Sequence, residues 1–126
     1  MSIKVLVVED EYMTRDLLRM VLERYKMEVF EAADGREALH KVAQHKPDVI
    51  VLDVMMPRMD GIDMVKELRA NEAWQDIPVI MISAKSHQMA VREGLEAGAN
   101  MYMAKPVNQR KLLANIRELT AVLADA

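Results

Sequence analysis

The side chains of this chain that could carry out chemistry stand at the ends of short apolar runs. Acidic, hydroxyl and amino groups follow four of these runs: Glu9, Asp10, Glu11, Asp53, Ser83 and Lys105. Each group alone has a structural explanation, such as an acid favoured at a helix N-terminus. Asp53 is the strongest candidate for function, because a charge that closes a buried strand is costly without a partner.

These groups form a chemically complete set for phosphoryl transfer. Carboxylates brought close together repel one another, and Mg²⁺ held by one or two carboxylates, waters and phosphate oxygens would relieve that repulsion. An aspartate can attack phosphorus and form an aspartyl-phosphate. Lys105 would neutralise charge on the transferred group, and Ser83 would donate a hydrogen bond to it. The set therefore predicts a phosphoryl group on Asp53, provided that the fold brings the strand ends together.

Strand and helix patterns alternate along the chain. The predicted strands are Lys4–Val8, Glu28–Glu31, Val49–Asp53, Val79–Ile82 and Met101–Ala104. The predicted helices are Tyr12–Tyr25, segments that start near Gly35 and after Gly61, His87–Ala97 and Gln109–Leu123. Such alternation indicates βαβ units and a parallel sheet covered on both faces. The fold class is therefore α/β, a doubly wound five-stranded parallel sheet with five helices.

The apolar side chains of the helical patterns predict which faces are buried. In the first helix we expect a common apolar side for Leu17, Leu18, Val21 and Leu22. The last helix repeats an apolar residue at Leu112, Ile116, Leu119 and Leu123. The twelve methionines favour flexible filling of the core. The alternative is an adaptable partner surface, for which Met101 and Met103 are the best candidates.

The strand ends are the expected place for a ligand site. In open parallel sheets, ligands bind outside the carboxyl ends of the strands, beside the topological switch point. If the sheet order is 2-1-3-4-5, the first, third, fourth and fifth strands are neighbours. Their ends would then bring three carboxylates, the Ser83 hydroxyl and the Lys105 ammonium into one pocket.

Length and composition exclude several classes of protein. The 126 residues have the length of one domain. The chain has no cysteine, so disulfides and thiolate zinc sites are excluded. A cytoplasmic location is expected, because neither a signal peptide nor a transit peptide is recognisable. The apolar runs are too short to span a bilayer, and the net charge of -3 argues against general nucleic-acid binding.

Taken together, these motifs resemble a response-regulator receiver domain of two-component signalling, similar to the chemotaxis regulators. The resemblance runs from Val5 to about Leu119 and rests on VLVVEDE, VIVLDVMMPRMDG, VIMISA and GANMYMAKP. It implies the sheet order 2-1-3-4-5. It also implies Mg²⁺-dependent phosphorylation, with Mn²⁺ as an alternative metal, by a histidine kinase or a histidine phosphotransfer protein. Such a domain is a switch in a phosphorelay and not a turnover enzyme.

The resemblance also assigns roles around the phosphorylation site. Asp53 would accept the phosphoryl group and bind the metal. Asp10 would bind the metal directly, Glu9 mainly through water, and Met55 through its backbone carbonyl. Lys105 would contact the phosphoryl group.

The remaining roles that the resemblance implies concern the switch and the loops. Ser83 would be the switch hydroxyl, and Tyr102 the aromatic ring that turns inward when Ser83 moves toward the phosphate. The bond between Lys105 and Pro106 is expected to be cis. Pro57 and Gly61 would shape the loop after Asp53, because proline fixes φ and glycine permits conformations closed to other residues.

The output surface would be formed by the segments 87–97, 101–104 and 109–123, which would bind a downstream protein target. Asn100 and Met101 stand where many receivers have two acids, and Val107 stands where transcription-factor receivers often have Phe. These departures favour a stand-alone regulator, a monomer or weak phosphorylation-dependent dimer with residues 1–126 as its only domain, that makes no direct contact with nucleic acid. A receiver module cut from a larger response regulator is the alternative.

Other functional classes lack the residues they need. Phosphatases of the haloacid dehalogenase type also phosphorylate a strand-end Asp, but they need a second Asp two residues later, where this chain has Met55. A flavin carrier would need a Ser/Thr/Gly-rich loop after the first strand, which is acidic here. No GxxxxGK[ST] sequence is present. Met55 and Lys85 flank the site, and we expect a bulky Met55 to shield an acyl phosphate from water.

Overall fold

A computed structural model of the chain describes residues 2–56 and 58–121. Strands and helices alternate within these residues. The strands are β1 (Lys4–Val8), β2 (Glu28–Ala32), β3 (Val49–Asp53), β4 (Val79–Ser83) and β5 (Met101–Ala104). The helices are α1 (Tyr12–Arg24), α2 (Gly35–His45), α3 (Gly61–Ala70), α4 (Gln88–Ala97) and α5 (Gln109–Leu119). The strand and helix order is the predicted one.

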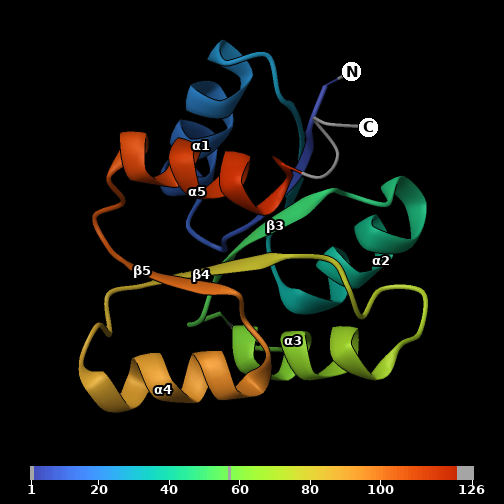
Figure 1. The fold of residues 1–126 in the computed structure, drawn as a ribbon, viewed down its shortest axis with the longest axis vertical. Coiled ribbons are helices and arrows are strands. Elements are labelled where there is room, and N and C mark those ends of the chain that lie inside the picture. Colours follow the sequence, from blue (N-terminus) through green and yellow to red (C-terminus); the bar gives the residue numbers. More distant parts are fainter. Residues whose placement is uncertain (1, 57, 122–126) are drawn as a thin grey trace.

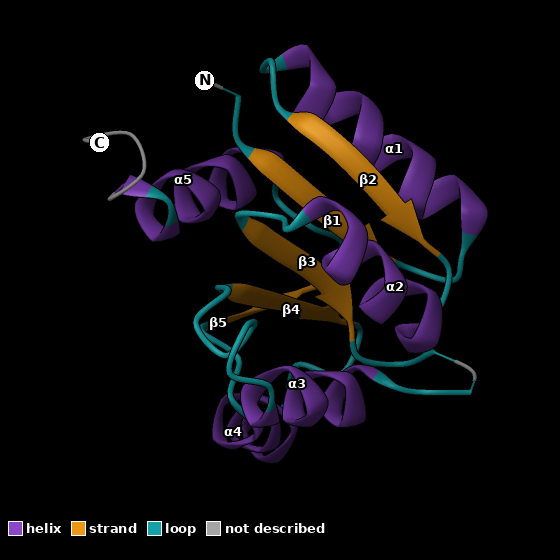
Figure 2. Ribbon diagram, turned by 90° about the vertical axis from the view of Figure 1, so that its right-hand side faces the viewer, coloured by secondary structure: helices purple, strands orange, loops and turns teal. Residues whose placement is uncertain are grey.

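All strand pairs are parallel, and the sheet has the order β2-β1-β3-β4-β5. Helices α1 and α5 cover one face, and α2, α3 and α4 cover the other (Figures 1 and 2). The predicted doubly wound fold and the sheet order 2-1-3-4-5 are therefore confirmed. No helix in the described part of the chain combines the length and the apolar character needed to cross a membrane.

The central strands are buried on both faces, as their continuous apolar sequences predict. Successive residues of β3 alternate between the two cores, with Ile50 and Leu52 facing one core and Val49 and Val51 facing the other. Asp53 ends this buried strand and is itself only 4% exposed. The strands thus form a rigid frame whose carboxyl ends carry the polar groups.

The element boundaries differ from the predictions by a few residues. β2 extends to Ala32 and β4 to Ser83. α1 ends at Arg24, and α5 ends at Leu119, after which the backbone and side chain of Thr120 bond to the carbonyl of Ile116. The predicted end of the last helix at Leu123 lies outside the described residues.

Two expectations about apolar side chains were wrong. Leu17 was expected on the buried side of α1, but it is 54% exposed, because the phase of α1 turns Leu18 and Leu22 toward the sheet and leaves Leu17 facing away from it. Met103 was a candidate for a partner surface, but it is buried in the core beneath α1 and α5. Met101 is half-buried. The methionines with large exposed side chains are Met13, Met20, Met55 and Met89.

Candidate functional site

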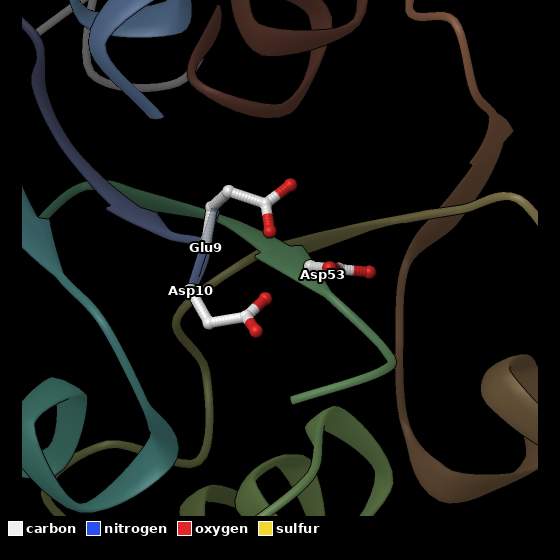
Figure 3. A group of neighbouring side chains, drawn as sticks. All are labelled: Glu9, Asp10 and Asp53. Carbon is white, nitrogen blue, oxygen red and sulfur yellow. The ribbon is translucent and has the colours of Figure 1, made fainter. Parts of the chain in front are cut away.

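Three carboxylates converge at the carboxyl ends of β1 and β3. Glu9 and Asp10 follow β1, Asp53 is the last residue of β3, and the two strands are hydrogen-bonded neighbours. One carboxylate oxygen from each lies within 4.8 Å of the others, and Figure 3 shows the three side chains extending into the same space. Glu9 and Asp53 are buried, whereas Asp10 is exposed. The strand ends thus place the predicted acidic residues together.

The third consecutive acid, Glu11, has a different position. It is the N-cap of α1, and its carboxylate accepts hydrogen bonds from the backbone N–H groups of Met13 at 3.1 Å and Thr14 at 2.8 Å. An acid at a helix N-terminus satisfies donors that have no partner within the helix. Glu11 therefore caps the N-terminus of α1 and is not part of the acidic cluster, which consists of Glu9, Asp10 and Asp53.

Lys105 supplies a positive charge to this acidic cluster. Its Nζ lies 2.6 Å from Glu9 Oε1 and 3.2 Å from Asp53 Oδ2. Its backbone N–H donates to the carbonyl of Ser83 at 2.9 Å, which holds the end of β5 beside the end of β4. The bond between Lys105 and Pro106 is cis, as predicted. Burial lowers the pKa of the ammonium, but the hydrogen bonds and charges of Glu9 and Asp53 raise it by more.

The acidic cluster carries more negative charge than Lys105 neutralises. Burial raises the pKa of Glu9, Lys105 lowers it in part, and the nearby Asp53 raises it further. Although the Asp10 side chain is exposed, partial desolvation by the surrounding loops and the neighbouring Glu9 raise the pKa of its carboxyl as well. A raised carboxyl pKa means that the ionised form is disfavoured in the folded protein. A cation bound among these carboxylates would therefore remove an unfavourable interaction.

The donor atoms of the acidic cluster fit a small, hard divalent cation. Carboxylate oxygens are the ligands of Mg²⁺ and Mn²⁺, and the exposed Asp10 leaves a side open to the waters that Mg²⁺ retains. The Met55 N–H donates to Asp53 Oδ1 at 3.2 Å, which holds the start of the following loop against the acidic cluster. Ligation by the Met55 carbonyl stays a prediction.

Ser83 and Tyr102 both bond to the backbone of Lys85. Ser83 is fully buried at the end of β4, and its Oγ accepts the Lys85 N–H at 3.0 Å. The half-buried Tyr102 donates its hydroxyl to the Lys85 carbonyl at 2.5 Å. The Tyr102 ring lies against Gly94 of α4, where an added Cβ would come within 2.9 Å of a ring carbon. The predicted switch residues therefore share one loop residue.

The loop between β3 and α3 requires glycine for a reason other than the predicted one. Gly61 was expected to adopt a conformation closed to other residues, but Gly98 is the glycine with positive φ in the described part of the chain. A Cβ at Gly61 would lie 2.8 Å from the Asp53 carbonyl oxygen, so glycine is needed for close approach to the end of β3. Pro57 lies outside the described residues.

A cavity of about 490 Å³ opens beside the acidic cluster. Its lining combines groups from the strand ends and from α4: Asp10, Val54, Met55, Met56, Asp60, Ile62, Lys85, Ala90, Glu93 and Tyr102. The sequence predicted neither Ala90 nor Glu93 here, because α4 shows no signal that distinguishes its inner residues. The cavity extends from the acidic cluster to the aromatic ring.

Sequence comparisons identify relatives over most of the chain. A family model described as "response regulator receiver domain" matches residues 5–117. The alkaline phosphatase synthesis transcriptional regulatory protein PhoP of Bacillus subtilis is 43% identical over 119 residues, which are 94% of this chain and 49% of that protein. The response regulator MprA of Mycolicibacterium vanbaalenii is 40% identical over 94% of this chain and 51% of its own length. The chain thus spans about half the length of these curated relatives.

Solved structures of similar proteins share the whole fold. A putative response regulator from Chloroflexus aurantiacus has a TM-score of 0.92 and 32% identity, covering 96% of this chain and 99% of that chain. The chemotaxis protein CheY4 of Vibrio cholerae has a TM-score of 0.89 and 34% identity, covering 94% of this chain and 99% of that chain. These matches confirm the resemblance that the sequence motifs indicated.

Proposed function

This chain belongs to the response regulator receiver domains of two-component signalling, and we propose that phosphorylation of Asp53 is its switch. The observation that carries the proposal is the position of Lys105, which contacts both Asp53 and Glu9 where the carboxylates converge. A phosphoryl group on Asp53 would lie beside this ammonium and beside acids that can hold a divalent cation.

The proposed reaction transfers a phosphoryl group from a phosphohistidine of a partner protein. A carboxylate oxygen of Asp53 attacks phosphorus, a P–O bond forms, the P–N bond breaks, and the imidazole nitrogen keeps the electron pair and takes up a proton. Lys105 stabilises charge on the phosphoryl oxygens. When bound by Glu9, Asp10, Asp53 and the Met55 carbonyl, Mg²⁺ or Mn²⁺ would neutralise further charge on these oxygens.

The product would be a signal and not the intermediate of a turnover enzyme. Hydrolysis by an Asp-based phosphatase needs an acid or base two residues after the nucleophile, and that position is Met55. The Met55 side chain is 52% exposed and lines the cavity beside Asp53. An apolar group there supplies no proton and restricts the approach of water, which supports a phosphorylated state that persists.

We infer that the phosphohistidine partner docks on the exposed face of α1. Four large apolar or aromatic side chains of α1 are exposed: Tyr12, Met13, Leu17 and Met20. A groove of about 410 Å³, lined by Leu17, Val21 and Val107 among others, leads from this face to Lys105. A partner on this surface could present its histidine to Asp53. Leu17→Glu should then slow transfer from a phosphorylated histidine kinase and leave transfer from a small phosphodonor unchanged.

The downstream target is proposed to bind the surface of α4, β5 and α5. Met89 on α4 is 79% exposed, and the half-buried Met101 belongs to β5. Tyr102 on β5 packs against Gly94 on α4, so a change at this ring would alter the same surface. The switch would run from Asp53 through Ser83 to Tyr102.

Two arrangements of the output are compatible with this switch, and we favour a separate target protein. Val107 and Met101 support this choice, as the sequence suggested. Asn100 carries less weight, because its Oδ1 accepts hydrogen bonds from the Val79 N–H at 2.9 Å and from Arg69 at 3.0 Å, a structural role that is independent of output. In the alternative, residues 1–126 are the receiver module of a longer regulator.

Mass spectrometry of the intact protein tests the phosphoryl acceptor. After incubation with Mg²⁺ and a small phosphodonor such as acetyl phosphate, the chain should gain one phosphoryl group, and Asp53→Asn should gain none. Asp60→Asn is the matched control, because Asp60 lines the same cavity and caps α3, a role that asparagine also fills. Absence of the gain in the unsubstituted chain, or its persistence in Asp53→Asn, would refute the proposal.

A further inference from the structure

Arg15 is not part of the acidic cluster, but it hydrogen-bonds to the peptide group between two of the acids of the cluster, Glu9 and Asp10. Arg15 lies in α1, and its side chain is only 17% exposed. Its Nη1 donates a hydrogen bond to the backbone carbonyl of Glu9 at 2.8 Å, and its Nε lies 3.6 Å from Glu31 Oε1 on β2. We propose that Arg15 is a positioning residue for the metal site, which holds Asp10 in place through the carbonyl of Glu9.

The geometry of the peptide group gives this bond its effect. The carbonyl of Glu9 lies in one plane with the nitrogen and Cα of Asp10, so a bond that fixes the carbonyl also fixes the start of Asp10. Glu9 has further anchors, because its N–H donates to the Ala32 carbonyl at 3.0 Å and its side chain bonds Lys105. Asp10 is exposed, so the position of its carboxylate depends on its backbone more than that of Glu9 does.

The surroundings of Arg15 keep its guanidinium in this orientation. Glu31 lies beside Nε, and the Tyr12 ring centroid lies 5.6 Å from the guanidinium carbon. The planar guanidinium can bond a carbonyl and a carboxylate from different nitrogens at once, which the ammonium of lysine does less well. The acidic loop is thereby joined to β2 as well as to α1.

Arg19 provides a matched control on the same helix. It lies 3.8 Å from the same Glu31 oxygen and bonds Asp16 and Glu23, whereas its hydrogen bonds among the described residues include none to Glu9. Replacement of either arginine by glutamine removes the same charge from the same region. Loss of a nearby positive charge by itself strengthens the binding of a cation. Weaker Mg²⁺ binding in Arg15→Gln but not in Arg19→Gln would therefore show that Arg15 positions a metal ligand.

The inference rests on the proposed metal site, and Mg²⁺ binding tests it without reference to activity. Loss of a group that orients a metal ligand typically weakens metal affinity about 10- to 100-fold. For Arg15→Gln we expect about 10-fold, because water can replace part of the lost bond at this surface. Arg15→Lys should recover part of the loss, and Arg19→Gln should bind Mg²⁺ at least as tightly as the unsubstituted chain.

Isothermal titration with MgCl₂ at constant ionic strength measures these affinities, and thermal melting without metal shows that each variant is folded. Equal or tighter binding by Arg15→Gln would overturn the inference, as would equal weakening in Arg19→Gln. If Arg15→Gln does not fold, the same comparison is made between Arg15→Lys and Arg19→Lys. Absence of Mg²⁺ binding by the unsubstituted chain would instead refute the proposed metal site and, with it, this inference.

Discussion

Replacement of Lys105 by methionine removes the ammonium that lies 2.6 Å from Glu9 and 3.2 Å from Asp53. Glu9 is 0% exposed, so its carboxylate would keep little hydration after losing this partner. We expect the metal-free variant to lose about 3 kcal/mol of unfolding free energy, because removal of one partner leaves an uncompensated buried charge.

The magnitude follows from the two contacts and from the exposure of the lysine. At an effective dielectric constant of about 20, each contact is worth about 5 to 6 kcal/mol of direct attraction. Most of that is offset, because the ammonium regains hydration on unfolding and its side chain is 25% exposed. Measured losses for broken buried pairs are about 3 to 5 kcal/mol, and partial exposure places Lys105 at the lower end.

The loss should depend on pH with a defined sign. Burial raises the pKa of Glu9, and removal of the ammonium would raise it further. A carboxyl whose pKa is raised on folding contributes stability below its ordinary pKa of 4.5, and this stability is lost as the pH rises through the folded value. Urea denaturation of Lys105→Met at about pH 5 and about pH 8 should therefore show the larger deficit at about pH 8.

Two further measurements decide whether the acidic cluster causes the loss. Saturating Mg²⁺ should restore much of the stability of Lys105→Met, because a ligand that binds the folded state stabilises it. The double variant Lys105→Met/Glu9→Gln lacks both the ammonium and the buried Glu9 carboxylate, so no unpaired charge is left at position 9. Its loss of unfolding free energy should therefore be smaller than that of Lys105→Met alone. Additive losses in the double variant, or a deficit that is unchanged between the two pH values, would refute the reasoning.

Three other predictions follow from contacts of the site. Gly94→Ala should cost about 1 to 3 kcal/mol in urea denaturation, because the added methyl group would lie 2.8 Å from the Met81 sulfur and 2.9 Å from the Tyr102 ring; a loss no larger than that of the exposed control Glu93→Ala would contradict this. Met55→Asn should change the rate at which the phosphorylated chain loses its phosphoryl group, measured by intact mass over time, and an unchanged decay would remove the shielding role of the side chain. Mg²⁺ affinity, measured by titration calorimetry, should fall on acidification through the raised pKa values of Glu9 and Asp10, because protonated carboxyls do not bind the metal; an affinity independent of pH would exclude these two ligands.

Short-range patterns predicted the strands and the acids at their ends, whereas the sheet order that makes β1 and β3 neighbours was predicted from the resemblance to receiver domains. Apolar runs of strand length end at the acids, and parallel strands place their carboxyl ends at one edge of the sheet. Glu11 shows the limit of this reasoning. The sequence does not distinguish Glu11 from the acids Glu9 and Asp10 that precede it. Its role as the N-cap became clear only from the position at which α1 begins.

Close packing between distant segments could not be read from local patterns. Gly61 looks like a residue chosen for its φ, whereas the structure requires it because the loop passes within van der Waals distance of the end of β3. Leu17 follows the same i, i+4 rule as Leu18, and only the phase of α1 relative to the sheet separates them. The bond from Arg15 to the Glu9 carbonyl has no sequence signal beyond the presence of an arginine in the helix.

The backbone of Lys85 connects the two side chains proposed to form the switch. Its N–H bonds the Ser83 hydroxyl oxygen, and its carbonyl accepts the hydroxyl of Tyr102. In the proposed switch, a Ser83 side chain that turned toward a phosphoryl group on Asp53 would release that N–H, and water could replace the lost bond at the exposed Lys85 and allow the loop to rotate. Such a rotation would move the Lys85 carbonyl, which accepts the Tyr102 hydroxyl. The Tyr102 ring already packs closely against Gly94 of α4, so a movement of the ring toward α4 would require the helix to move as well. Coupling from Asp53 to the α4–β5–α5 surface would therefore pass through the main chain at Lys85, whatever its side chain.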